Sequence, residues 1–267
     1  MLRLPDAADE NLVVHAGWVQ RHVAGMRVVE DEALVIIDSG LACDTFNYVL
    51  RARLNRDSAA NRVHGAIGYF RDAGRPFSWW VGPADQPGDL GRLLIDAGLE
   101  QAETELAMAA DVSTVADVDL SPVGLRIERV RTAVQLRHFA ALNAANWTPP
   151  DSNVLEFYAR ASNVLLSDRC PLWFYVGYVD DVPVATSERT VGGGVAGLYN
   201  ISTAAAHRRR GIGTAMTAQP LVDARAAGLP TGILQAAAEG VGVYQRVGFR
   251  PFGQITEYKP KPTGHSG

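Results

Sequence analysis

The stretch STAAAHRRRGIGTAM, residues 202–216, stands out in this sequence. Three consecutive arginines lead into two glycines, and apolar residues then recur at helical spacing. A helix that begins directly after glycine-rich backbone exposes N–H groups without intrahelical partners, and its dipole favours negative charge there. Gly211 and Gly213 have no Cβ, so an anion can approach the backbone, while the arginines add positive charge. The stretch therefore predicts a diphosphate-binding loop followed by a helix over residues 212–227.

Composition restricts what this loop can do. The 267 residues are 47% apolar and 20% charged, which is typical of a globular protein with one large or two modest domains. The net charge of −4 argues against nucleic acid as a partner, so the arginine run acts locally. Two cysteines, scattered histidines and the lack of a long apolar run predict no disulfide framework, no metal site and no membrane partner. We expect a cytoplasmic protein.

Two similar halves can be made out along the chain. Each ends in a helical stretch, a glycine followed by a bulky apolar residue, and a strand-like run, over residues 90–112 and again over 243–259. Residues 113–124 are polar and turn-rich, which places the boundary between the halves there.

The second half has a clear order of elements. Residues 124–132 alternate as a half-buried strand does, and two helices should follow, the second beginning after the potential caps Ser152 and Asn153. A hairpin turning at Asp180-Asp181 and a third strand lead to the arginine-glycine loop. The predicted order is strand, two helices, three antiparallel strands, helix, strand, helix, strand.

Two motifs in this half carry a resemblance. The loop is neither GxxxxGK[ST] nor GxGxxG, and it fits R/Q-x-x-G-x-G/A with Arg208, Gly211 and Gly213. Downstream, VYQRVGF fits Y-x-x-x-G-F with Tyr244 and Gly248-Phe249. On this strand, loop and helix, the set resembles the coenzyme A loop of the GCN5-related N-acetyltransferase (GNAT) superfamily.

The resemblance implies an α/β (mixed α+β) fold made of two tandem GNAT-like halves, each with a mostly antiparallel mixed sheet flanked by helices. Residues 119–259 would be the catalytic domain and 260–267 a flexible tail. Residues 1–118 would be a degenerate copy, because no R/Q-x-x-G-x-G/A occurs there. We expect that half to bind no acyl-CoA productively and to pack against the other half or frame the acceptor pocket.

Carried over by position, the resemblance implies acetyl-CoA as the cofactor. In the family, the strand before the loop splays from its neighbour and pairs with the pantetheine arm, with a backbone N–H near Ile201 facing the thioester oxygen. The implied cofactor-binding residues are Ile201, Ser202, Thr203, Arg208, Arg209, Arg210, Gly211, Gly213 and Thr214.

The chemistry would be direct attack of an amine on the thioester through a tetrahedral intermediate, with Tyr244 as the acid that protonates the departing thiolate. The base is left open. Glu188 on the preceding strand, Asp151 and Glu156 are carboxylate candidates, each also readable as an ordinary surface carboxylate, and a water relay through Asn200 is an alternative. Trp147 and Asp151, in the stretch between the two helices, are candidates for substrate contact. An asparagine that is frequent seven residues before the tyrosine in this family is Ala237 here.

The function implied is an acetyl-CoA-dependent N-acyltransferase that acts on the primary amine of a small molecule, as a monomer or homodimer. A non-catalytic acyl-CoA-binding sensor or partner module is the alternative, favoured by the lack of a carboxylate on the strand before the loop.

Overall fold

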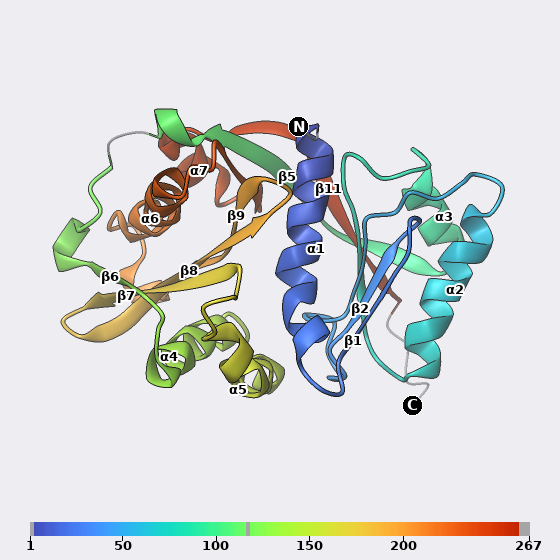
Figure 1. Ribbon diagram of the computed structural model, residues 1–267, viewed down its shortest axis with the longest axis horizontal. Coiled ribbons are helices and arrows are strands. Elements are labelled where there is room, and N and C mark those ends of the chain that lie inside the picture. Colours follow the sequence, from blue (N-terminus) through green and yellow to red (C-terminus); the bar gives the residue numbers. More distant parts are fainter. Residues whose placement is uncertain (1–2, 116–117, 262–267) are drawn as a thin grey trace.

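The computed structural model describes residues 3–115 and 118–261, which form one mixed sheet with helices on both faces (Figure 1). The first half contains α1 (Leu4–His22), β1 (Arg27–Glu30), β2 (Val35–Asp38), β3 (Tyr48–Leu50), α2 (Ala59–Asp72), β4 (Ser78–Val81), α3 (Leu90–Asp96) and β5 (Leu99–Asp111). After two short 3₁₀ turns, the second half contains β6 (Arg126–Arg129), α4 (Ala133–Ala144), α5 (Ser152–Leu165), β7 (Leu172–Val179), β8 (Val182–Gly192), β9 (Val195–Thr203), α6 (Ile212–Ala226), β10 (Thr231–Ala236), α7 (Val241–Val247) and β11 (Arg250–Pro260). Among the helices of these two ranges, none is long and apolar enough to cross a membrane.

The two halves share one eleven-stranded sheet, because each gives its last strand to the other. The strand order is β1-β2-β3-β4-β11-β5-β10-β9-β8-β7-β6. Strand β5 runs antiparallel to β10 of the second half, and β11 runs antiparallel to β4 of the first half. The predicted similarity of the halves is confirmed, since β3-α2-β4-α3-β5 has the same order as β9-α6-β10-α7-β11, with a parallel first strand pair in both. The exchange joins the two predicted sheets into one.

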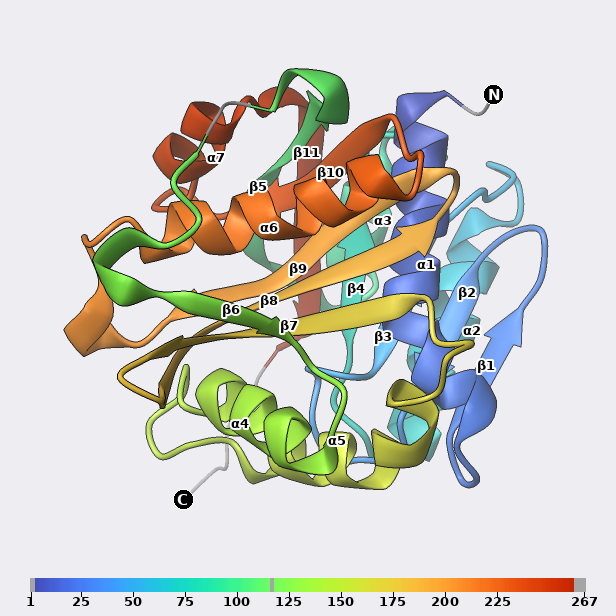
Figure 2. The same ribbon diagram turned by 60° about the vertical axis from the view of Figure 1, so that its left-hand side comes forward.

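Helices cover both faces of the second-half strands. Side chains alternate along β7, so that Tyr175 packs in a cluster with Met216 of α6, while Phe174 packs with Phe139 of α4 and Tyr158 of α5. Helix α1 belongs to the first half of the chain, yet it packs on β8 and β9 of the second half (Figures 1 and 2). Residues of the first half therefore lie directly over the second-half sheet.

Local sequence signals explain the main turns and helix starts. Asp180 and Asp181 both have positive φ, at 49° and 62°, which matches the type I′ turn favoured in two-residue hairpins and confirms the predicted hairpin. The predicted caps of α5, Ser152 and Asn153, are wrong by one residue. The N-cap is Asp151, whose carboxylate accepts a hydrogen bond from the Asn153 backbone N–H at 2.8 Å.

Candidate active site

The arginine-glycine loop ends in the helix that the sequence predicts. Helix α6 begins at Ile212, and its N-cap is Gly211 with a φ of 83°, a conformation that favours glycine. Arg209 also has a positive φ, of 60°. No side chain caps this end among the described residues. The first N–H groups of a 15-residue helix are therefore free to bind an anion.

Strand β9 separates from β10 next to this loop. The parallel pairing with β10 ends at Leu198, although β9 continues to Thr203. On its other edge β9 has a bulge, because Asn200 and Ile201 together lie opposite the single residue Ser187 of β8. Asn200 has a φ of 51° at this bulge. The opening between β9 and β10 is the splay that the resemblance predicts.

A cavity of about 680 Å³ occupies this opening. It is lined by Ile201, Thr203, Arg208, Arg209, Gly211, Gly213, Thr214, Glu239, Gly240, Val243, Tyr244 and Arg246. The fold thus brings together seven of the nine residues that the sequence assigns to the cofactor. Of the other two, Arg210 is exposed outside the lining, and Ser202 lines a different cavity. The guanidinium of Arg208 is held beside the strand, because its Nε donates a hydrogen bond to the Thr203 carbonyl at 3.1 Å.

Tyr244 reaches the same cavity from α7. Burial, with a smaller contribution from the nearby carboxylate of Glu105, raises the pKa of Tyr244 to about 12. The phenol therefore keeps its proton at neutral pH. Gly240 leaves room for the ring, since a Cβ at that position would lie 2.7 Å from the Tyr244 Cε2 atom. A tyrosine that keeps its proton therefore lines the larger cavity.

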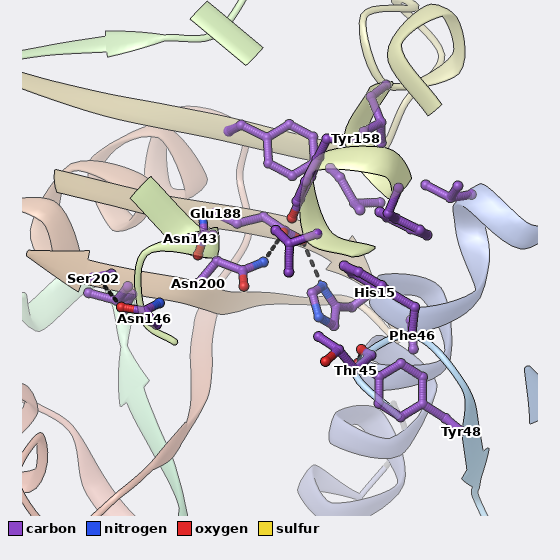
Figure 3. A pocket seen from close by; sticks show the side chains of 18 of the residues that line it. His15, Thr45, Phe46, Tyr48, Asn143, Asn146, Tyr158, Glu188, Asn200 and Ser202 are labelled. Carbon is purple, nitrogen blue, oxygen red and sulfur yellow. Dashed lines mark hydrogen bonds and ion pairs between the residues drawn. The ribbon is translucent and has the colours of Figure 1, made fainter. Parts of the chain in front are cut away.

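A second, smaller cavity of about 140 Å³ lies on the other side of Ile201. Most of its wall is aromatic and apolar, with contributions from α1, α4, α5 and the segment before β3 (Figure 3). Trp147 lines it, as does Ser202, whose hydroxyl donates a hydrogen bond to Asn146 Oδ1 at 2.9 Å. Asp151 lines neither cavity, and its carboxylate caps α5. Ile201 lines both cavities, so the two cavities meet at the bulge of β9.

Glu188 lines the smaller cavity and has three hydrogen-bonding partners. Its side chain is 1% exposed. Oε1 lies 2.7 Å from His15 Nδ1 and accepts a hydrogen bond from the Thr190 hydroxyl at 2.6 Å. Oε2 accepts a hydrogen bond from the Asn200 amide at 2.8 Å (Figure 3). Glu188 and Asn200, both candidates from the sequence, are therefore direct neighbours.

His15 is a site residue that the sequence does not reveal. It comes from α1, and its partner Glu188 lies 173 positions later in the chain. The same helix carries Asn11 one turn earlier, and the Asn11 amide donates to the carbonyl oxygens of Thr190, Gly192 and Val195 at 3.0–3.1 Å. A local pattern contains no signal for contacts at such separations. The spacing of Asn11 and His15 at i and i+4 is the only hint that they share a helix face.

Comparisons with known proteins agree with this geometry. Residues 181–252 match the family model described as an acetyltransferase (GNAT) domain. No curated protein matches the sequence. A GCN5-related N-acetyltransferase from Kribbella flavida superposes with a TM-score of 0.74 at 17% identity, covering 100% of this chain and 98% of that one.

Two further solved structures share the architecture. A tandem GNAT protein from the clavulanic acid biosynthesis pathway has a TM-score of 0.61 at 12% identity, with 97% of this chain and 95% of that chain covered. A GCN5-related N-acetyltransferase from Sphaerobacter thermophilus has a TM-score of 0.61 at 14% identity, covering 85% and 76%. At these identities the likeness is one of fold. Residues 181–252 therefore belong to the GCN5-related N-acetyltransferase superfamily, and the whole chain has the fold of that superfamily.

Proposed function

We propose that this protein is an acyl-CoA-dependent N-acyltransferase that transfers an acyl group, in the simplest case acetyl, to the primary amine of a small molecule. The observation that carries the proposal is the position of Ile201, which lines both cavities. An acyl group held in the larger cavity would meet an amine held in the smaller one at the bulge of β9. Direct transfer needs such a junction, because the amine nitrogen must reach the thioester carbon.

The residues around the larger cavity suit an acyl-CoA. The free N–H groups at the start of α6 and the guanidinium groups of Arg208 and Arg209 would bind the diphosphate. The unpaired edge of β9 from Tyr199 to Thr203 would bind the pantetheine arm as an added strand does. A Cβ at Gly213 would find its nearest neighbour, Thr203 Oγ1, at 3.8 Å, so the backbone there is open to a ligand.

Bound acyl-CoA would supply an activated acyl group with a thiolate as leaving group. Tyr244 would hydrogen-bond to the departing sulfur and give it a proton, since its phenol stays protonated at neutral pH. The backbone at the bulge, beside Ile201, would donate to the carbonyl oxygen as negative charge develops on it. The aromatic wall of the smaller cavity favours an acceptor with a compact, largely apolar body.

Ligand-dependent melting tests the binding step. Acetyl-CoA should raise the melting temperature of the wild type by mass action. Gly213→Glu should lose this rise, because it adds bulk and negative charge at the diphosphate, while Gly213→Ala controls for the loss of glycine itself. No rise in the wild type at millimolar acetyl-CoA would contradict the proposal.

Thiol release tests the transfer step. The wild type should release free coenzyme A thiol from acetyl-CoA with at least one of benzylamine, 2-phenylethylamine, isobutylamine and propylamine. Binding of acetyl-CoA without thiol release from any of these amines would favour the non-catalytic sensor instead.

A further inference from the structure

We propose that His15, on the helix contributed by the first half of the chain, is the general base that removes the proton from the acceptor amine. The proposal rests on the acyltransferase function above. The first half of the chain would then supply a catalytic residue as well as part of the cavity wall.

The surroundings of Glu188 exclude it as the direct base and make it the group that positions His15. The carboxylate is 1% exposed and already has three hydrogen-bond partners, Thr190, Asn200 and His15. The His15 side chain is 19% exposed and lines the acceptor cavity. Of the two groups, the imidazole is therefore the more accessible to an amine in this cavity.

The hydrogen bond to Glu188 fixes the tautomer of His15. Since the Glu188 carboxylate can only accept, Nδ1 of His15 must donate to it across 2.7 Å. In the neutral ring, Nε2 then carries the lone pair. Within the described residues, Nε2 makes no hydrogen bond to the protein. The ring is thus held as a proton acceptor.

The ring is also held against rotation. It stacks on Tyr199 with ring centroids 3.7 Å apart and an angle of 8° between the planes. The Tyr199 hydroxyl in turn donates to Asn11 Oδ1 at 2.8 Å. Asn11 is fully buried and fastens α1 to the ends of β8 and β9. The orientation of His15 is therefore set by the packing of α1 on the second-half sheet.

Four titratable groups surround the imidazole, and Glu188 is the one among them that carries a negative charge. They are Glu188 of β8, Tyr199 of β9, Tyr158 of α5 and Tyr48 at the start of β3. Burial raises the pKa of each of the three tyrosines, so their phenols stay neutral. The Glu188 carboxylate would stabilise the imidazolium that forms when Nε2 takes a proton.

The proton and electron balance is complete without a further reactant. The lone pair of the neutral amine forms the C–N bond, and the carbonyl π electrons move to oxygen. The amine nitrogen, now positively charged, gives one proton to Nε2 of His15. When the carbonyl re-forms, the C–S bond breaks, its electron pair leaves with sulfur, and the thiolate takes the Tyr244 proton. Solvent then carries a proton from the imidazolium to the phenolate, and both residues return to their starting states.

Chemical rescue tests the proposal. His15→Ala should lower kcat/KM by roughly 10² to 10⁴-fold with the best amine of the panel, and added imidazole should restore part of the activity. The melting-temperature rise with acetyl-CoA should persist in this variant, because His15 is outside the larger cavity. His22→Ala is the matched control, since His22 is an exposed histidine on the same helix whose Nδ1 bonds to the Trp18 carbonyl. Wild-type kcat/KM in His15→Ala would overturn the proposal.

A second measurement needs neither acceptor nor turnover. In ¹⁵N NMR of the ligand-free wild type, His15 should be the tautomer with the proton on Nδ1, and a proton on Nε2 would overturn the proposal. A wild type that releases no thiol with any amine would instead count against the acyltransferase function, so the two failures differ.

Discussion

The imidazole of His15 and the phenol of Tyr199 lie face to face, with their centroids 3.7 Å apart and their planes within 8°. One ring comes from the first helix of the chain, and the other comes from the strand at which the two cavities meet. This contact couples the two halves at the site itself, and Asn11 fastens it from one turn away. The halves are therefore parts of one site as well as parts of one sheet.

Asn11→Asp should destabilise the protein by about 3 kcal/mol, since it puts a carboxylate oxygen against three backbone carbonyl oxygens. Urea unfolding at neutral pH measures this change. Asn55→Asp is the control, because Asn55 is exposed and its Oδ1 only accepts a hydrogen bond from the Asp57 N–H, which aspartate also does. Equal stability of the two variants would contradict the role of Asn11.

Tyr244→Phe should lower kcat about 10- to 100-fold and leave the dissociation constant of acetyl-CoA nearly unchanged, because the hydroxyl acts on the departing sulfur. Steady-state kinetics and calorimetry measure the two quantities. A general acid loses its proton, and with it its catalytic effect, as the pH rises through its pKa. Burial raises the pKa of Tyr244 to about 12. The wild type should therefore show no loss of activity from this group between pH 7 and 10. Tyr178→Phe, at a hydroxyl bonded to His138 outside both cavities, should behave as the wild type does.

Glu105→Gln should make the protein more stable at pH 8 than the wild type. Burial, with repulsion from Glu103 and Glu257, raises the pKa of Glu105 to about 7. Because the folded state holds this proton more tightly than the unfolded chain, the associated stability is present below pH 4.5 and is lost as pH rises through 7. The gain from glutamine at pH 8 relative to pH 5 should be on the order of 2 kcal/mol.

Unfolding free energies at pH 5 and pH 8 check this prediction. Glu100→Gln is the matched control, because Glu100 is an exposed carboxylate on the same strand and does not contribute to the raised pKa of Glu105. Parallel pH dependences for the wild type and Glu105→Gln would show that the Glu105 carboxyl group is solvated, against the prediction.

Phe46→Ala should shift acceptor preference toward larger amines. Phe46 belongs to the first half, lines the smaller cavity and stacks on Phe157 at 3.8 Å between centroids. Its removal enlarges the cavity, so kcat/KM for 2-phenylethylamine relative to propylamine should rise roughly 10-fold. Leu155→Ala, which trims an exposed side chain of α5 outside this cavity, should keep the wild-type ratio. A constant ratio in both variants would argue that the acceptor binds elsewhere.

The sequence predicts the elements whose signals are local. The start of α6 at Gly211, the Asp180-Asp181 turn and the order of the second-half elements follow from spacing and turn chemistry over a few residues. The exchange of β5 and β11 is not predictable in this way, because the alternation of a strand is the same whichever neighbour it pairs with. The same distinction applies to the residues of the site. The loop residues and Tyr244 belong to contiguous motifs, so the sequence predicts them.

His15 and Asn11 lack such a signal, because their partners are 173 to 188 positions away. Glu188 is one of several carboxylates in the sequence, and only the fold shows it buried between Thr190, Asn200 and His15. Asp151 shows the opposite case. Its position between two helices suggests substrate contact, and in the structure its carboxylate caps α5, as a local capping rule predicts.

The decisive measurement is a crystal structure of the wild type with acetyl-CoA. We expect the diphosphate at the N–H groups that start α6 and the pantetheine arm along β9. The acetyl group should lie beside Ile201, with Tyr244 near the sulfur and His15 facing the carbonyl from the smaller cavity. Acetyl-CoA bound anywhere else, or an acetyl group that points away from the junction of the two cavities, would contradict this expectation.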